Sequence, residues 1–540
     1  MEGETTSYPP IEPSTFDLIV VGTGLPESVV AAAASAAGET VLHLDTNPFY
    51  GAHYASLPLN DFVTFLQSHS QPSEVPEAES DDSIPLVTRS LYSSLEISSH
   101  SDEPLKNSRR FNIDLAGPRV FLCSDSMIDV ILKTGINQYM EFKSVDTSFV
   151  GDVDGKLMSV PDSRSAIFKD RSLSIIEKNR LMKFFKLVQA HFSEENEEDR
   201  IPEEDLESPF VEFLTKIGLS QKLKSIILYA IVNASYDQDN IKSCKDVINT
   251  KSGISRLALH HSSVGRFPNA NGAMIYPIYG QGEVPQAFCR RAAVKGCIYV
   301  LRMPVVCVLK DKEYGTYKGV KLVSGQRLFS SRLILAPSFT PLVPSTAQAS
   351  KSHDAGHTDA KEKVARGICI TNNSIRPEVS NCLVFFPPKS LYPEQIALVR
   401  AFQLSNNVAV CPPGMFVTYL SAMTIDAVEG KKLLTAAINA LFSIPFSGND
   451  GSRGIDNSSE NIEVKPTLLW SALYMQELNK FQGALDSISN MVMPDEHLDY
   501  NHLLDAIERF FQEIYPGKEF LATSSQSNEH PNYADSELDS

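Results

Sequence analysis

The pattern of apolar and polar residues near the N-terminus predicts a strand, a helix and a second strand in close succession. Leu18–Val21 is a short run rich in β-branched apolar residues, and Thr40–Leu44 is another. Between them lies the alanine-rich segment Ser28–Ala37, which has the composition of a helix and ends before Gly38. A strand, a helix and a strand in this order are the opening unit of a Rossmann-type α/β fold.

The turn between the first strand and the helix contains Gly22 and Gly24, and Asp45 stands at the end of the second strand. Glycines in this turn, with an acid about twenty residues further on, usually cradle a dinucleotide. Glu27, however, occupies the position of the third glycine in the G-x-G-x-x-G pattern. That glycine normally allows helix and strand to approach closely, beside a pyrophosphate at the helix N-terminus.

Electrostatics decides what Glu27 implies for a cofactor. A carboxylate ~5 Å from each phosphate charge costs roughly 3 kcal/mol per pair at an effective dielectric constant of about 20. A helix N-terminus stabilises an anion by only about 0.3–2 kcal/mol. If Glu27 faces the site, the repulsion is the larger effect, and we expect a Rossmann scaffold that binds no dinucleotide.

The rest of the chain predicts two domains. Apolar residues recur at helical spacing in four segments: Ser126–Lys133, Ile175–Phe192, Phe210–Ile217 and Gln221–Val232. We therefore expect residues 126–235 to form an all-helical domain. Strand and helix patterns resume after it and end in a last helix, Asn501–Tyr515. This order predicts a discontinuous α/β domain, residues 16–125 and 236–520, with the helical domain inserted into it.

Two stretches have the composition of segments without a core. Residues 70–108 are rich in Ser, Pro, Asp and Glu, with five acids close together: Glu74, Glu77, Glu79, Asp81 and Asp82. This composition predicts an acidic surface insertion that is partly disordered. The polar tail at residues 521–540 is also expected to remain unfolded.

Composition limits the classes of function. With 540 residues, 42% of them hydrophobic, the chain can bury more than one core. Its formal net charge of −18 argues against nucleic acid as a partner. The sequence contains no run of ~18 apolar residues that would span a membrane and no signal peptide at its N-terminus. The eight cysteines form no C-x-x-C pair, which is typical of reduced core residues in a cytosolic protein.

Three motifs carry a resemblance to a known family: TGLPES at 23–28, D-x-NPFYG at 45–51 and YPIYGQGEVPQ at 276–286. Together they resemble the family of Rab GDP dissociation inhibitors and Rab escort proteins, over about residues 16–520. Several features favour the escort branch, of the plant type: the greater length, the acidic insertion, and the segments Leu468–Tyr474 and Pro494–Leu504.

The resemblance implies a flavoprotein-like α/β domain without bound FAD, and a surface on that domain that grips a GDP-bound Rab GTPase. The family's contact residues correspond to Tyr50, Glu283, Arg290 and Tyr299, and Val300 stands where a methionine is often found. Without the resemblance, Tyr50 would be interpreted as a buried ring near a strand end. Glu283 and Arg290 would be interpreted as an ion pair within a helix. Both interpretations stay open at this point.

In the escort branch the helical domain also contacts Rab geranylgeranyltransferase, an alpha/beta heterodimer, and Phe184 and Phe185 lie in the corresponding helix. The alternative is that the apolar residues of this helix pack in the protein's own core and dock no partner. The resemblance thus implies a non-catalytic accessory protein that presents unprenylated Rab GTPases to the transferase, holds the geranylgeranyl group transiently and escorts the product to membranes. Such a protein is expected in the cytoplasm, with transient membrane association.

Two other functions remain as alternatives. A Rab GDP dissociation inhibitor, which recycles prenylated Rab proteins, shares the same motifs. An FAD-dependent oxidoreductase shares the fold class, but it would need a small residue in place of Glu27 and usually a late Gly-Asp pair, which the C-terminal third lacks. Neither a metal-binding spacing of His, Cys and acids nor a G-x-S-x-G or Walker motif occurs. We therefore expect no catalytic residue and no metal site.

Overall fold

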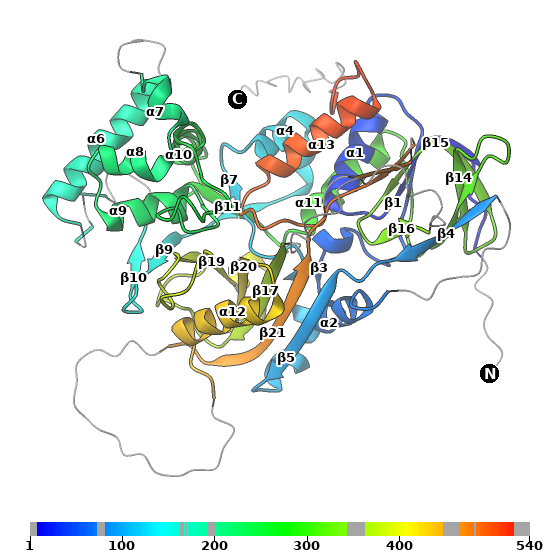
Figure 1. Ribbon diagram of the computed structural model, residues 1–540. Coiled ribbons are helices and arrows are strands. Elements are labelled where there is room, and N and C mark those ends of the chain that lie inside the picture. The colour runs from blue at the N-terminus through cyan, green and yellow to red at the C-terminus, as the bar shows by residue number, and fades with distance from the viewer. Residues whose placement is uncertain are drawn as a thin grey trace, which may run out of the picture.

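Two large β-sheets and a group of helices make up the molecule, described here as a computed structural model (Figure 1). The structure describes residues 8–72, 82–161, 167–168, 170–171, 173–192, 200–342, 362–445, 465–479, 482–485 and 487–522. Most of the C-terminal tail that is expected to be unfolded, and the acids Glu74, Glu77, Glu79 and Asp81, lie outside the described residues.

The parallel half of the first sheet confirms the Rossmann-type α/β fold. Its strand order is β12-β2-β1-β15, and β23 pairs with the C-terminal end of β15, Leu333–Leu335. All of these neighbours run parallel. The strands are β1 (Thr15–Val21), β2 (Val41–Leu44), β12 (Ile298–Val300), β15 (Arg327–Leu335) and β23 (Ile488–Asn490).

Four helices pack into one apolar cluster with the parallel strands: α1 (Leu25–Ala36), α4 (Ser126–Thr134), α11 (Glu283–Val294) and α13 (Asn501–Ile514). Helix α1 lies against both α11 and α13 and is buried almost throughout. Its alanine side chains are short, so two helices can approach it closely. The alanine run that predicts this helix therefore also explains its central position.

Beyond β15 the sheet continues with antiparallel strands. They are β14 (Tyr317–Leu322), β13 (Val305–Lys310), β4 (Ser83–Thr88) and β16 (Phe339–Pro341), and β22 (Gln482–Leu485) forms a hairpin with β23. The far side of the whole sheet packs on a separate cluster that includes Ile19, Leu42 and Val308.

The second sheet has eight strands in the order β10-β9-β18-β19-β20-β17-β21-β5. They are β10 (Leu157–Ser159), β9 (Thr147–Gly151), β18 (Cys382–Phe386), β19 (Val399–Ser405), β20 (Phe416–Thr424), β17 (Lys363–Thr371), β21 (Leu468–Glu477) and β5 (Tyr92–Ser99). Helix α12 (Ala427–Leu441) covers one face, where it packs on β17, β20 and β21.

Small sheets and short helices connect these layers. β7 (Phe121–Leu122), β11 (Met274–Pro277) and β8 (Phe142–Ser144) form one small sheet, and β3 (Ser56–Leu57) pairs with β6 (Ile113–Asp114). Helices α2 (Leu59–Ser68) and α3 (Glu103–Lys106) lie beside β5 and β21.

A helical lobe lies at the left of the molecule in Figure 1. It consists of α6 (Ile175–Phe192), α7 (Glu203–Glu207), α8 (Phe210–Lys216), α9 (Gln221–Ser225), the π-helix η5 (Ile226–Ile231) and α10 (Thr250–Ser263). Its buried residues belong to the same cluster as one face of the second sheet, so the lobe shares its core with that sheet. None of the helices among the described residues has the length and apolar character to cross a membrane.

The expected limits of the all-helical domain, residues 126–235, are wrong in three respects. Helix α4 packs with α13 in the Rossmann layer, and residues 142–159 provide β8, β9 and β10. Conversely, α10 lies beyond residue 235 and packs on α6, α7 and α8. Helical spacing shows that a segment is a helix, but it does not show which layer the apolar stripe packs against.

The interpretation of residues 70–108 as a surface insertion is also wrong for those of its described residues that form β4 and β5. β4 joins the first sheet and β5 forms the edge of the second. Ile84, Leu86 and Tyr92 are buried between them and the rest of the fold. The many serines around these apolar positions give the segment the composition of a loop, although long-range pairing makes it two strands.

Candidate functional site

The glycine turn after β1 is filled by a side chain of its own helix. Glu27 is 1% exposed, in the first turn of α1. Its carboxyl group folds back over Gly24, and a Cβ added to Gly24 would lie 2.3 Å from Glu27 Oε2. Burial raises the pKa of Glu27 to about 8. The carboxyl is therefore neutral at pH 7 and takes the space that the second glycine of this motif normally leaves open for a pyrophosphate.

The acid at the end of β2 is also fully engaged within the chain. Asp45 is buried, and its carboxylate accepts hydrogen bonds from the Thr23 hydroxyl at 2.6 Å, the Thr23 amide at 2.8 Å and the Asn47 amide at 2.7 Å. The Thr23 hydroxyl in turn accepts from the Gly51 amide at 3.0 Å. In dinucleotide-binding proteins this acid contacts a ribose. Here it fixes the loop of residues 46–51, which carries Tyr50.

Three rings connect this loop to the glycine turn. Tyr50 packs edge-on against Tyr299, with ring centroids 5.9 Å apart, and Tyr299 lies 4.8 Å from His43. His43 is buried in β2, and its Nε2 donates to the Gly22 carbonyl at 2.5 Å. Burial lowers the pKa of His43 to about 4, so the ring stays neutral. Tyr50 is thus a half-buried ring on a fixed support, and part of it still faces solvent.

The turn before α11 is fixed by a second buried acid, Asp114. Its carboxylate accepts from Ser56 Oγ and Tyr276 Oη, both at 2.5 Å, and from the Gln281 amide at 2.9 Å. Gly280 has φ +107°, and a Cβ there would lie 2.4 Å from Ser56 Oγ. The glycines of the YPIYGQGE motif therefore allow the turn to lie directly on β3 and β6.

Glu283 and Arg290 stand on α11, which starts at this turn. Burial raises the pKa of the half-buried Glu283, and the charge of Arg290 opposes this shift. No salt bridge joins Glu283 to Arg290 in the described part of the chain, so the ion-pair interpretation is wrong. Arg290 is exposed, and its guanidinium lies 5.9 Å above the ring of Tyr139.

Tyr299 and Val300 do not share a face. They are consecutive in β12, and successive side chains of a strand point to opposite faces. Tyr299 packs with the cluster around α1 and α11, whereas Val300 packs with the cluster on the other side of the sheet. The structure therefore brings together Tyr50, Glu283, Arg290 and Tyr299, which we call the α11 surface, and leaves Val300 apart.

The two phenylalanines of α6 differ in exposure. Phe184 is 3% exposed and belongs to the core that the helical lobe shares with the second sheet. Phe185 is half-buried at the edge of that core, with its ring centroid 5.9 Å from that of Phe184. Phe184 is thus a core residue, which leaves Phe185 as the one of the pair that reaches the surface.

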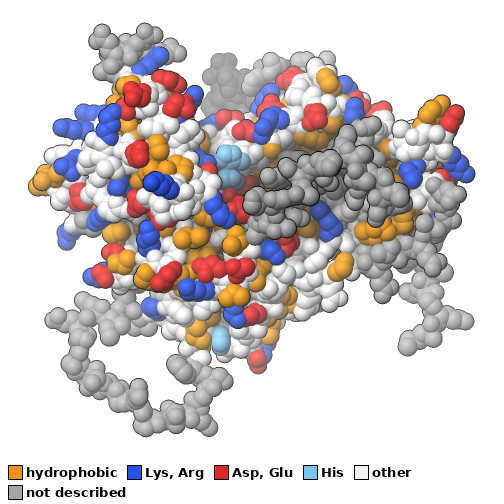
Figure 2. All heavy atoms as spheres, in the orientation of Figure 1, with side chains coloured by type: hydrophobic (Ala, Val, Ile, Leu, Met, Phe, Trp, Pro, Cys, Tyr) orange, Lys and Arg blue, Asp and Glu red, His pale blue; other side chains and the backbone are white. Residues whose placement is uncertain are grey.

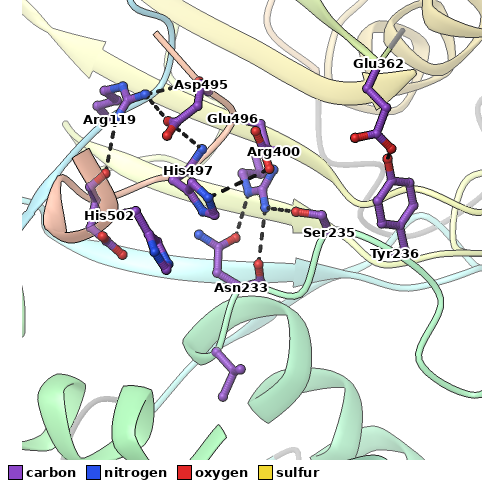
Figure 3. Close-up of polar contacts among 12 residues, drawn as sticks. Arg119, Asn233, Ser235, Tyr236, Glu362, Arg400, Asp495, Glu496, His497 and His502 are labelled. Atoms are coloured by element: carbon purple, nitrogen blue, oxygen red, sulfur yellow. Dashed lines mark hydrogen bonds and ion pairs between the residues drawn. The ribbon is translucent and has the colours of Figure 1, made fainter. Parts of the chain in front are cut away.

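A buried polar network joins the helical lobe to the sheets (Figure 3). Arg400 donates from Nε to Asn233 Oδ1 at 2.6 Å and from Nη2 to Ser235 Oγ at 3.1 Å. Arg119 donates to the Asp495 carboxylate and to the Asp499 carbonyl. These contacts fix the end of η5 to the second sheet, and the start of α13 to β7.

A hollow of about 590 Å³ opens beside this network, between α10 and α13. The rings of His497 and His502 lie 4.3 Å apart at its wall. Arg256 of α10 donates to His502 Nε2 at 3.2 Å, so this contact also crosses from the lobe to the Rossmann layer. Figure 2 shows histidine side chains gathered in this hollow.

The described residues provide neither a cluster of metal ligands nor a reactive thiol beside these features. Among the described residues no group of three or more His, Cys, Asp and Glu side chains could hold a metal ion. All eight cysteines are free, and burial raises the pKa of Cys289 and of Cys297 to about 12. These two thiols therefore stay protonated at pH 7, which makes them poor nucleophiles.

Sequence reasoning did not identify His43, Asp114 or Tyr139 as parts of this site. His43 offers a signal, since a histidine inside an apolar strand needs a hydrogen-bond partner. Asp114 gives the same signal, because it lies between the apolar residues Ile113 and Leu115. Tyr139 gives no signal, because its contact with Arg290 joins residues far apart in the chain.

Comparisons with known proteins agree with this architecture. The sequence profile of the GDP dissociation inhibitor family matches residues 12–89 and 77–446. Rab escort protein 1 of Arabidopsis thaliana is 51% identical, over 97% of this chain and 96% of its own length. The Rab proteins geranylgeranyltransferase component A of Drosophila melanogaster is 27% identical, over 96% of this chain and 92% of its own.

A solved structure shows the same fold. Rab GDI from Plasmodium falciparum has a TM-score of 0.64 at 20% identity, covering 94% of this chain and 99% of that chain. At this identity the likeness concerns the fold alone, whereas the match to the plant relative extends over almost the whole sequence. The chain belongs to the GDP dissociation inhibitor family and, within it, to the Rab escort proteins.

Proposed function

We propose that the α11 surface binds GDP-bound Rab GTPases and that the chain escorts them through prenylation. One observation carries this proposal: Arg290 is exposed and forms no ion pair with Glu283, while the loop and turn around it are fixed by Asp45 and Asp114. An exposed arginine and tyrosine on a rigid support are typical anchors of a protein interface. The family membership supports the same partner.

We propose further that the chain is a non-catalytic accessory protein. A relative is named as a component of Rab geranylgeranyltransferase, which supports the transferase heterodimer as a second partner. That enzyme would supply the chemistry of thioether formation. This chain would contribute by holding the GTPase so that its C-terminal cysteines reach the enzyme, which is catalysis by positioning.

The helical lobe is proposed to contact the transferase and to shelter the geranylgeranyl group for a short time. Burial of an apolar chain is worth about 0.8 kcal/mol per CH₂, so a prenylated GTPase without a carrier would aggregate or enter a membrane. Phe185 lies at the edge of the lobe's core, where it can offer an aromatic contact to the enzyme. The proposed place of action is the cytoplasm, with transient membrane contact at delivery.

A dinucleotide does not fit the residues that are present, and we propose that none binds. The carboxyl of Glu27 fills the space beside Gly24, and the carboxylate of Asp45 already accepts from Thr23 and Asn47. FAD would have to displace the Glu27 carboxyl and break the hydrogen bonds that Asp45 accepts. The glycine turn then serves only to hold the Tyr50 loop.

The binding surface is tested by two neighbouring arginines. Arg290→Ala should weaken binding of GDP-bound Rab at least roughly tenfold, because it removes a central interface anchor. Arg291→Ala, one residue further along α11, should leave binding nearly unchanged. Titration calorimetry with an unprenylated Rab protein measures both. Equal effects of the two variants, or a loss of thermal stability in Arg290→Ala, would contradict the proposed surface.

The transferase contact is tested by two neighbouring phenylalanines. Phe185→Ala should reduce the stimulation of Rab prenylation by the transferase without lowering the melting temperature. Phe184→Ala creates a cavity in the core and should destabilise the fold by about 3–5 kcal/mol. Prenylation assays and thermal unfolding are measured on both variants. If Phe185→Ala stimulates prenylation as well as the unchanged chain, Phe185 is not the docking residue.

The absence of a bound dinucleotide is tested by absorbance. The purified chain should show no flavin bands after gel filtration, and addition of FAD should not raise its melting temperature, since ligand binding to the folded state would do so. Glu27→Gly alone should not create FAD binding, because Asp45 remains engaged. A yellow preparation would refute this part of the proposal.

The neutral state of Glu27 predicts a pH dependence of stability. Its pKa is about 8 in the folded chain, against an ordinary value of 4.5 for a glutamate in the unfolded chain. The folded state therefore holds the proton more tightly, and its stability falls as pH rises through this window, by on the order of 5 kcal/mol. Glu27→Gln should flatten this decline in urea unfolding, and Glu141→Gln, an exposed control, should not. If stability declines equally with pH in Glu27→Gln, a titrating group other than Glu27 causes the decline.

A further inference from the structure

The outward face of α6 exposes large apolar side chains at the tip of the helical lobe. Ile175 is 78% exposed and Ile176 is 65% exposed, in the first turn of the helix. Phe168, whose carbonyl accepts from Lys178 Nζ at 2.8 Å, also lies near the start of the helix and is 62% exposed. The buried positions of the helix, Leu181, Phe184 and Val188, lie on its other side.

Lysines follow the isoleucines on the same face. Lys183 and Lys186 are exposed, and their spacing from Ile175 and Ile176 places them on the outward side of the helix. Neither lysine forms an ion pair within the described part of the chain. The acid of this helix, Glu177, accepts instead from Ser220 Oγ at 2.8 Å and from the Ser174 amide at 3.0 Å.

The charge of this face contrasts with the rest of the molecule. The chain has a formal net charge of −18, and α7, near the other end of α6, has four acids: Glu203, Glu204, Asp205 and Glu207. Figure 2 shows basic and hydrophobic side chains together at the outer edge of the lobe, and acidic side chains gathered near α7. An anionic surface would therefore attract the outward face of α6 and repel α7.

We propose that the outward face of α6 docks on an anionic lipid bilayer. Two features favour a membrane over a protein. Lysine is depleted at protein interfaces, where tyrosine, tryptophan and arginine are enriched. Lysines beside exposed aliphatic and phenylalanine side chains are instead the composition of helices that lie in the headgroup region, with apolar groups inserted and cations on lipid phosphates.

This surface would turn the helical lobe toward the membrane at delivery. The role of this surface in delivery rests on the proposed function. Binding of lipid by the chain without a GTPase does not. Phe185 lies on the side of α6 that packs on the lobe's core, so the proposed transferase contact and the lipid face use different sides of the helix. The two roles can be separated by substitution.

The test uses the full chain and vesicles of phosphatidylcholine, with or without phosphatidylserine, in a flotation assay without any GTPase. The unchanged chain should float with phosphatidylserine vesicles only, and less at high salt. Lys183→Ala combined with Lys186→Ala should weaken binding about fivefold for each lysine. The matched pair Lys312→Ala and Lys318→Ala, on the β13–β14 hairpin at the opposite end of the molecule, should bind as the unchanged chain does.

The apolar contribution is tested separately by Ile175→Ser combined with Ile176→Ser. This variant should lose vesicle binding at every salt concentration, whereas Val428→Ser, at a residue 80% exposed on α12, should not. The proposal is overturned if the unchanged chain ignores phosphatidylserine vesicles, or if the control variants lose as much binding. It is equally overturned if the α6 variants bind vesicles normally and fail only with the transferase, since the face would then dock that enzyme. Rab binding, measured on the same variants, shows independently whether the proposed function holds.

Discussion

The contact of Asp495 with two buried arginines is the interaction on which the arrangement of the molecule depends. Arg119, before β7, pairs with its carboxylate, and Arg366, on β17, donates to its carbonyl at 2.7 Å. Burial acts to lower the pKa of Arg119, but Asp495, Tyr500 and Tyr54 together raise it by more, so the guanidinium stays charged. The Arg119 side chain is 1% exposed, so removing the carboxylate would leave a buried charge without its partner, which costs about 3–5 kcal/mol. One acid thereby joins the Rossmann layer to the second sheet.

The same contact reaches the proposed binding surface. The carbonyl of Arg119 accepts from Gln281 Nε2 at 2.8 Å, and Gln281 Oε1 accepts from the Tyr500 hydroxyl at 2.7 Å. Gln281 lies in the turn that starts α11. On the other side, Arg400 fixes Asn233, at the end of η5, to the second sheet. The α11 surface and the helical lobe are therefore held in a defined relation, as a protein that presents one partner to another requires.

We propose above that the Rossmann turn binds no dinucleotide, because the space and the acid that would bind one are taken by contacts within the chain. Glu27 occupies the phosphate space, and Asp45 holds Thr23 and Asn47. A carboxyl group buried at a helix N-terminus is tolerated because it stays protonated. The loop of residues 46–51, which carries Tyr50, is fixed by contacts with Asp45 and Thr23 within the chain.

The sequence by itself determined the opening strand–helix–strand unit, most of the later helices, and the family. The apolar run at Leu18–Val21, the alanines of α1 and the late strand β21 follow from local periodicity, because these residues must be buried wherever the chain places them. Glu27 could be recognised from the glycine pattern alone. Only the tertiary structure decided that serine-rich residues 83–99 are two strands, that α4 belongs to the Rossmann layer, and that Phe184 is core while Phe185 reaches the surface. These three outcomes depend on which distant segment packs against each strand or helix face. The local spacing of apolar residues does not specify that segment.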